Sequence, residues 1–244
     1  MFAPILDGGT GFLIGASRDH IWLDADSAAP HIYGNERYDV FAGSMYLRDA
    51  TGTIAFPVFE GSACAGNYFV TLDPEPYVTP AVAIAGNWNV IPRLPVELSP
   101  HIQVYKDAVA DLLRQHGIEE PQVELTEVLQ IDLEGDGVNE VLITATRIRD
   151  GVFPPVDAGD YTLVMLRKIV AGDVITIPFV VEVYLEPNEL AYPFVYTVAG
   201  VMDLNADGRM EIVVHGARWE GMRVMVFEIE GGDLHMVLSV SCTQ

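Results

Sequence analysis

Two segments of the chain repeat the same succession of strand-like and polar stretches. In each, two apolar, β-branched runs flank a short acidic loop, and two further apolar runs flank a Gly-Asp turn. The loops begin at Asp132 and Asp203, 71 residues apart, whereas the turns begin at Gly172 and Gly232, 60 residues apart, so the second unit lacks about eleven residues between its middle strands. We expect two four-stranded antiparallel meanders, spanning residues 123–185 and 195–241. Pro178 places the last strand of the first meander at an edge or a bulge.

Residues 1–98 carry shorter strand signals bounded by Gly, Pro and Asn, which predict a small β-rich region. The strands expected there cover residues 12–14, 36–42, 44–48, 53–59, 68–72 and 78–85. Residues 44–48 and 53–59 are predicted to form a hairpin. The acidic stretch at Asp24 can begin a short helix that Pro30 ends. The glycine-rich run 8–15 lacks a preceding strand and a following helix, so it predicts a turn and not a dinucleotide site.

One longer helix is predicted after the proline-rich connection at residues 86–100. Ser99 can cap its start, Pro100 suits its first turn, and Gly117 suits the position after its end. Apolar residues recur at helical spacing and predict one buried face; they are Tyr105, Ala108, Val109, Leu112 and Leu113. The expected fold is mainly β, α+β overall, with a β-rich region at 1–98 and a second region at 99–244 that holds the helix and both meanders.

The acidic loops carry the clearest chemical signal. Positions one, three, five and nine bear oxygen-containing side chains, which are Asp132, Glu134, Asp136 and Glu140 in the first loop and Asp203, Asn205, Asp207 and Glu211 in the second. Position six is glycine, which permits the sharp bend that such ligands need to converge. Position seven, Val138 or Arg209, offers only its carbonyl. Oxygen ligands at alternate positions predict a calcium site in each loop.

The pattern D-x-[DEN]-x-D-G-x-x-E resembles the calcium loops of FG-GAP and VCBS-type repeats, which occur in β-propeller blades, including those of integrin heads. An EF-hand fits less well, because position twelve holds Ile143 or Val214 and both flanks are strand-like. The resemblance implies Ca²⁺ and blade-like sheets, and it points to adhesion or extracellular binding, with enzymes among such families. A closed propeller needs about four blades and only two are visible. We therefore expect two packed blades whose outer faces the helix and the N-terminal region cover.

The loops differ at their third position. Glu134 stands where Asp or Asn is usual, and its longer side chain crowds the site, so we expect the second loop to bind more tightly. The alternative for each loop is a solvated Asp/Gly turn without metal, but two matching copies argue against it. Carboxylates held close together repel one another, and calcium removes that repulsion. Calcium is therefore expected to raise the thermal stability of the protein.

Charge limits the partners and the compartment. The chain has 35 acidic and 13 basic residues, a net charge of −22, which opposes binding to nucleic acid or to anionic lipid. No apolar run is long enough to span a membrane. The N-terminus lacks the features of a signal peptide, so the protein is either cytosolic or a mature secreted protein. Calcium loops favour the secreted interpretation, because free calcium in the cytosol is too low to fill weak sites. Cys64 and Cys242 form either one disulfide or two buried thiols.

Known catalytic motifs are absent: the sequence has no HExxH, GxSxG or P-loop pattern. We expect a calcium-stabilised, non-enzymatic extracellular or cell-surface module that binds a protein or a glycan. The alternative is an extracellular hydrolase of carbohydrate or another polymer, with catalytic carboxylates from the N-terminal region. By composition, the loop from His215 to Glu220 is the best candidate for contact with a ligand. We nevertheless prefer the interpretation that it is an ordinary loop between strands. Trp88 is either a sugar-stacking residue or, as we prefer, a half-buried Trp between regions.

Overall fold

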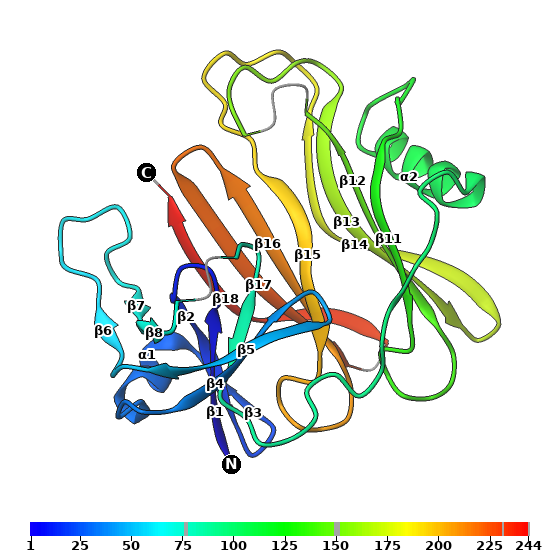
Figure 1. Cartoon of the computed structure of the whole chain (residues 1–244). Coiled ribbons are helices and arrows are strands. Elements are labelled where there is room, and N and C mark those ends of the chain that lie inside the picture. The colour runs from blue at the N-terminus through cyan, green and yellow to red at the C-terminus, as the bar shows by residue number, and fades with distance from the viewer. Residues whose placement is uncertain (76–77, 149–151, 231, 244) are drawn as a thin grey trace.

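The chain folds into stacked antiparallel β-sheets with one long helix, as Figure 1 shows for the computed structural model. The structure describes residues 1–75, 78–148, 152–230 and 232–243. The predicted class, mainly β with two blade-like meanders and a β-rich N-terminal region, is confirmed. None of the described helices is long and apolar enough to cross a membrane.

The first repeat forms the predicted four-stranded meander, and β10 (Val96–Glu97) from the connecting segment adds an unpredicted fifth strand beside β11 (Leu125–Ile131). The order of this sheet is β10, β11, β12 (Glu140–Arg147), β13 (Asp160–Val170) and β14 (Asp173–Tyr184). Strand β14 lies at the edge, and the β13–β14 register shifts where Met165 pairs with Pro178 and Val164 with Val180. The expected edge or bulge at Pro178 is therefore confirmed on both counts, because proline cannot donate a hydrogen bond to a neighbouring strand.

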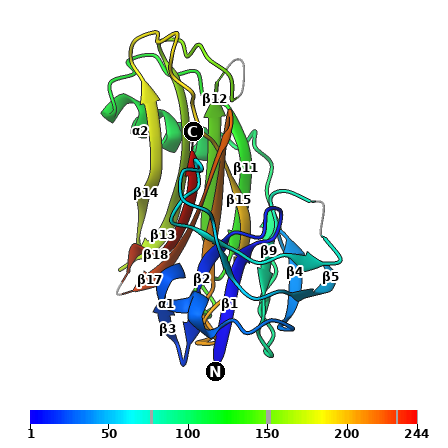
Figure 2. The same cartoon turned by 90° about the vertical axis from the view of Figure 1, so that its left-hand side faces the viewer.

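The second repeat forms a four-stranded sheet with the same up-and-down order. Its strands are β15 (Val195–Met202), β16 (Glu211–Arg218), β17 (Gly221–Glu230) and β18 (Asp233–Thr243). Figure 2 shows the long strands of both sheets running side by side. Alternate residues point to opposite faces of a strand, so each sheet has two apolar faces to cover.

The facing sides of the two sheets form one core. Leu142 and Leu166 of the first sheet pack with Ile212, Val214 and Phe227 of the second, and all are buried. The outer face of the first sheet, including Ile143, is covered by α2 (Gln103–Gln115). The outer face of the second sheet packs on the N-terminal sheet. The helix and the N-terminal region thus cover the outer faces of the two sheets, as expected.

The helix begins later than predicted. Gln103 is its first residue and Ile102 is the N-cap, without a side-chain hydrogen bond. The Ser99 hydroxyl instead accepts the His101 N–H at 3.2 Å, in a turn that precedes the helix. The predicted cap at Ser99 is wrong because Pro100 lies in this turn. Gly117 has a φ of +98°, as expected for the residue that ends a helix.

The N-terminal region is a seven-stranded sheet in the order β3-β2-β1-β9-β4-β5-β8, with a small β6–β7 pair beside it. The strands are β1 (Phe2–Asp7), β2 (Leu13–Arg18), β3 (Ile21–Leu23), β4 (Arg37–Ala42), β5 (Met45–Gly52), β6 (Phe56–Pro57), β7 (Tyr68–Phe69), β8 (Leu72–Asp73) and β9 (Val82–Ile84). The predicted hairpin between 44–48 and 53–59 is wrong. Residues 45–52 form one strand, and the hairpin is β4–β5, turning at Gly43 with a φ of +59°.

Two short N-terminal features come out close to expectation. Helix α1 (Ala25–Ala28) begins at Asp24, whose side chain accepts the Ser27 N–H, and Pro30 lies in the 3₁₀ helix η1 (Ala29–His31) that follows. The glycine-rich run forms a turn between β1 and β2. A strand does precede it, contrary to the prediction, but a strand also follows it, so the arrangement that holds a dinucleotide is missing here.

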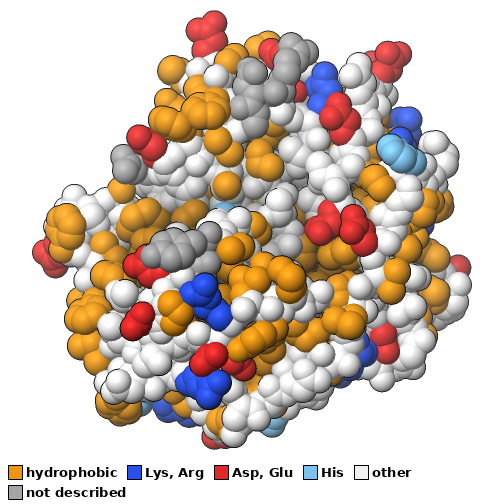
Figure 3. Space-filling view, in the orientation of Figure 1, with side chains coloured by type: hydrophobic (Ala, Val, Ile, Leu, Met, Phe, Trp, Pro, Cys, Tyr) orange, Lys and Arg blue, Asp and Glu red, His pale blue; other side chains and the backbone are white. Residues whose placement is uncertain are grey.

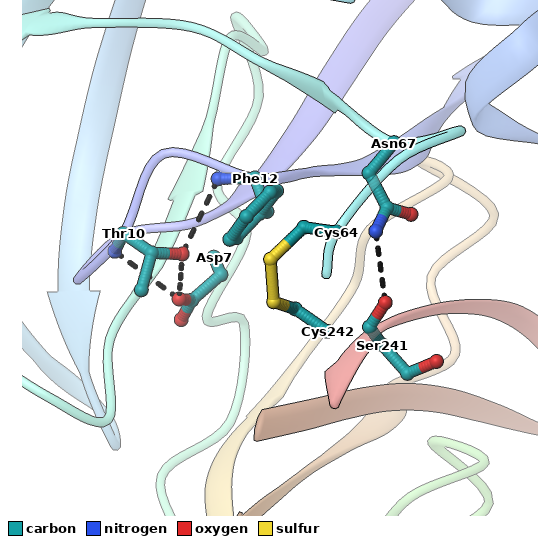
Figure 4. Close-up of a disulfide and its surroundings, with 7 residues drawn as sticks. All are labelled: Asp7, Thr10, Phe12, Cys64, Asn67, Ser241 and Cys242. Carbon is teal, nitrogen blue, oxygen red and sulfur yellow. Dashed lines mark hydrogen bonds between the residues drawn. A yellow bond between two sulfur atoms is a disulfide. The ribbon is translucent and has the colours of Figure 1, made fainter. Parts of the chain in front are cut away.

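A disulfide joins the N-terminal region to the last strand. Cys64, between β6 and β7, is bonded to Cys242 of β18, with 4.7 Å between their Cα atoms (Figure 4). Beside it, the Asn67 side-chain amide donates to the carbonyl of Ser241 at 2.8 Å. The choice that the sequence left open is thereby settled in favour of one disulfide.

Candidate functional site

The two acidic loops lie at the same end of their sheets, where β11 passes into β12 and β15 into β16. Figure 1 shows them below the strands in green and orange. The loops touch directly, since the Met210 N–H donates to the carbonyl of Leu133 at 2.9 Å. The structure therefore brings all ten predicted ligand residues into two adjacent loops.

Arg93 bridges the loops from the connecting segment. Its guanidinium donates to the carbonyls of Asp132 at 2.6 Å and Leu133 at 3.1 Å in the first loop, and to that of Gly208 at 2.9 Å in the second. A guanidinium carries five N–H donors in a fixed plane and can serve several carbonyls at once. Nothing in the sequence pattern marked this residue.

The same segment holds the start of the second loop. Trp88 is half-buried, and its indole N–H donates to the carbonyl of Asp203 at 2.8 Å. The Asp203 N–H in turn donates to the carbonyl of Val90 at 2.8 Å. The preferred interpretation of Trp88, a half-buried side chain between regions, is confirmed.

Both loops have the same internal hydrogen bonds at their first and sixth positions. The Asp132 carboxylate accepts the Gly137 N–H at 2.9 Å, and Asp203 accepts the Gly208 N–H at 3.1 Å. Position four is left-handed in both loops, with φ of +76° at Gly135 and +65° at Ala206. The left-handed fourth position is a requirement that the sequence pattern did not reveal, because only the first loop has glycine there.

The ninth position also plays the same part in both loops. Glu140 accepts the Leu133 N–H at 2.9 Å, and Glu211 accepts the Leu204 N–H at 2.7 Å. Each buried glutamate thus ties the end of its loop to the beginning. This hydrogen bond to the second residue of the loop explains structurally why the last acid stands at position nine.

Position five caps the bend. Asp136 accepts the Val138 N–H and Asp207 accepts the Arg209 N–H, each at 2.8 Å. The Arg209 side chain donates instead to the carbonyl of Ile229 at 3.1 Å. Among the described residues, no three acidic, histidine or cysteine side chains are grouped in a way that holds a metal. Apart from Glu134, the loop carboxylates accept hydrogen bonds from backbone amides, and they would have to turn from these amides to converge on an ion.

The second loop suits a cation best. One oxygen of Asp203, Oδ1, is buried without a hydrogen-bond partner, and the residue is only 5% exposed. Burial raises the pKa of Asp203, against the opposing effect of nearby loop N–H groups. Burial also raises the pKa of Glu211 well above its usual range, and Asp207 and Asp203 add to this. A buried oxygen without a partner and crowded carboxylates are what a divalent cation would satisfy.

The first loop suits a cation less well. Both oxygens of Asp132 accept loop N–H groups, from Gly135 at 2.6 Å, Asp136 at 3.1 Å and Gly137. The Glu134 carboxylate is paired with the ammonium of Lys168, whose side chain is 8% exposed. Burial raises the pKa of Glu140, while its bond from the Leu133 N–H and the charge of Lys168 act in the opposite direction. This loop already has an internal cation.

A cavity of about 320 Å³ opens beside the second loop. Residues from the loop and from two other segments line it, namely His20, Ile21, Trp22, Asn205, Asp207, Arg209, Glu211, Glu228, Ile229 and Glu230. The Trp22 indole N–H donates to Glu228 at 2.7 Å. Sequence reasoning missed Glu228, although the 60-residue offset between the repeats places it at the position of Lys168.

The loop expected at His215 to Glu220 is shorter than predicted. Strand β16 continues to Arg218, so only Trp219 and Glu220 form the turn. His215 is 5% exposed, and burial lowers its pKa. It is therefore a buried side chain of the sheet. The prediction failed because Gly216 and Ala217 resemble loop residues in sequence while pairing with Tyr196 and Val195 in the sheet.

Neither a scan of protein-family models nor searches of curated proteins and of solved structures finds a match to this chain.

Proposed function

We propose that this protein is a calcium-stabilised, non-enzymatic binding module that works outside the cell or at its surface. The observation that carries the calcium part is the buried, unpaired Oδ1 of Asp203 in a loop whose sequence resembles FG-GAP and VCBS-type calcium sites. The residues that would hold the ion are Asp203, Asn205, Asp207 and Glu211, with the carbonyl of Arg209. Bound calcium would offset the repulsion among these carboxylates and fix the β15–β16 connection.

The disulfide supports the location. Bonds such as Cys64–Cys242 persist in oxidising compartments and are rare in the cytosol. Calcium concentrations outside cells also suit loops of modest affinity. The net charge of −22 favours a neutral or cationic partner over nucleic acid.

The binding part is supported by exposed aromatic side chains at the end of the molecule opposite the loops. Phe153 and Trp219 are 47% and 43% exposed, with ring centroids 4.7 Å apart. Leu190 and Tyr192 are exposed too, at 83% and 45%. Figure 3 shows hydrophobic side chains on this upper part of the surface. Exposed aromatic and apolar groups are typical of surfaces that recognise proteins or glycans.

One pair of carboxyl groups outside the N-terminal region does not suit the hydrolase alternative. One cavity contains both Glu124 and Asp160. However, Asp160 pairs with Arg147 at 3.1 Å and accepts the Asp157 N–H at 2.9 Å, so both of its oxygens are held in structural contacts. A glycosidase needs one carboxyl group free to donate a proton and another free to act as nucleophile or base.

Thermal unfolding of the full chain tests the proposal. Protein stripped with chelator is compared with protein in excess calcium, with magnesium as the control ion. At free calcium of about 100 times the dissociation constant, stabilisation is about 2.7 kcal/mol, which raises Tm by roughly 5 to 10 °C. Asp207→Asn should reduce this shift, whereas Glu119→Gln, at an exposed glutamate outside the cavity beside this loop, should keep it. Equal melting temperatures with calcium and with chelator would remove the basis for calcium binding.

A further inference from the structure

The two repeats differ in charge at one equivalent position. Val141 pairs with Arg167 in the first sheet, and Ile212 pairs with Phe227 in the second. The next residue toward the loop is a glutamate in both repeats. By the same register, Glu140 lies opposite Lys168 in the first repeat, and Glu211 lies opposite Glu228 in the second. Residues directly opposite one another in antiparallel strands have Cβ atoms about 5 Å apart.

In the first repeat this position supplies a positive charge to the loop. The Lys168 ammonium bonds to Glu134, the third residue of the loop, and lies close enough to act on the charge of Glu140, the ninth. Lys168 is one of only two lysines in the chain and is buried. A buried ammonium persists where carboxylates compensate it.

In the second repeat the same position adds a negative charge. Glu228 and Glu211 line one cavity together with Asn205 and Asp207, and the Trp22 indole holds one oxygen of Glu228. The unpaired Oδ1 of Asp203 is a separate, buried acceptor in the same loop. Arg209 and His20 also line this cavity, but the Arg209 guanidinium donates to the carbonyl of Ile229, and among the described residues no lysine bonds to this loop as Lys168 does in the first repeat.

We propose that the chain binds one divalent cation, in the second loop with Glu228 as an added ligand, and that the Lys168 ammonium takes the place of the cation in the first loop. This inference rests on the proposed function and refines it, because the sequence alone assigns a calcium ion to each loop. An ammonium bonded to Glu134 both occupies that ligand and repels an incoming dication.

Calorimetric titration of the full, chelator-treated chain with calcium measures the stoichiometry. One ion per chain is expected. Two ions of comparable affinity would overturn the inference and leave the proposed function intact, whereas no binding would overturn both. To locate the ion, Asp207→Asn should weaken binding at least tenfold, and Asp136→Asn should leave it unchanged. The reverse pattern would place the ion in the first loop and contradict the inference.

Substitution at the paired positions tests the two roles. Lys168→Met should raise the stoichiometry to two, while Lys106→Met, at the only other lysine, should leave it at one. Glu228→Gln should weaken the single site at least tenfold, and Glu119→Gln, at an exposed glutamate outside this cavity, should not. Circular dichroism checks that each variant folds. A folded Lys168→Met protein that still binds one ion would refute the role of the ammonium, and unchanged affinity in Glu228→Gln would refute the added ligand.

Discussion

Arg93→Ala is expected to loosen both loops at once. The guanidinium makes three hydrogen bonds to loop carbonyls, at 2.6, 2.9 and 3.1 Å. A hydrogen bond from a charged donor contributes about 1.5 to 3 kcal/mol. Arg93 is partly exposed, so water can replace some of these bonds, and Leu133 keeps its bond from Met210. We therefore expect a loss of about 2 to 4 kcal/mol in the free energy of unfolding.

Urea unfolding monitored by circular dichroism measures this loss in the absence of calcium. A matched control is Arg37→Ala, which removes an exposed ion pair with Asp49 and should change stability by less than about 1 kcal/mol. Arg93→Lys keeps the charge but loses the planar fork and should recover only part of the stability. If Arg93→Ala were as stable as Arg37→Ala, the reasoning that this side chain joins the loops would be refuted.

Three further predictions concern other parts of the molecule. Burial, with the neighbouring charge of Glu97, raises the pKa of Glu127. The native state therefore loses stability as pH rises through that pKa. The difference in urea midpoint between Glu127→Gln and the wild type should accordingly be larger, in favour of the variant, at pH 7 than at pH 4. Replacing Cys64 and Cys242 by Ser opens a loop with a sequence separation of 178 residues. The free energy of unfolding should fall by about 3 to 5 kcal/mol, which calorimetry would detect as a lower melting temperature. Ala206→Gly relieves a left-handed alanine at φ +65° and should stabilise by up to about 1 kcal/mol in urea unfolding; no gain would show that the loop holds this conformation without strain.

The repeats were predictable because their pattern is local. Alternating apolar residues, the Gly-Asp turns and the acidic loops together define two meanders, and the shift at Pro178 fits its missing N–H. The sequence did not reveal the shift in the matching strand pair β17–β18, which has no proline. The hairpin at residues 44–59 was wrong because Asp49–Gly52 has turn-like composition. In the structure Asp49–Thr51 pair with β4 and Gly52 pairs with Leu72 of β8, so the strand depends on neighbours more distant in sequence.

The partners of the loops were not predictable from the loops themselves. Arg93 is 39 residues before Asp132, and only the folded chain brings them together. The disulfide likewise depends on how the N-terminal sheet packs against β18. By contrast, the charge reversal between Lys168 and Glu228 was available in the sequence, because both follow the 60-residue offset of the Gly-Asp turns. Comparing the repeats position by position beyond the loops would have found it.

A crystal structure of the protein grown with millimolar calcium tests the central claim most directly. We predict density for one ion in the second loop, within about 2.3 to 2.6 Å of oxygens from Asp203, Asp207 and Glu211. Carboxylates that still face the loop amides, with Asp203 unliganded and no ion between them, would contradict it.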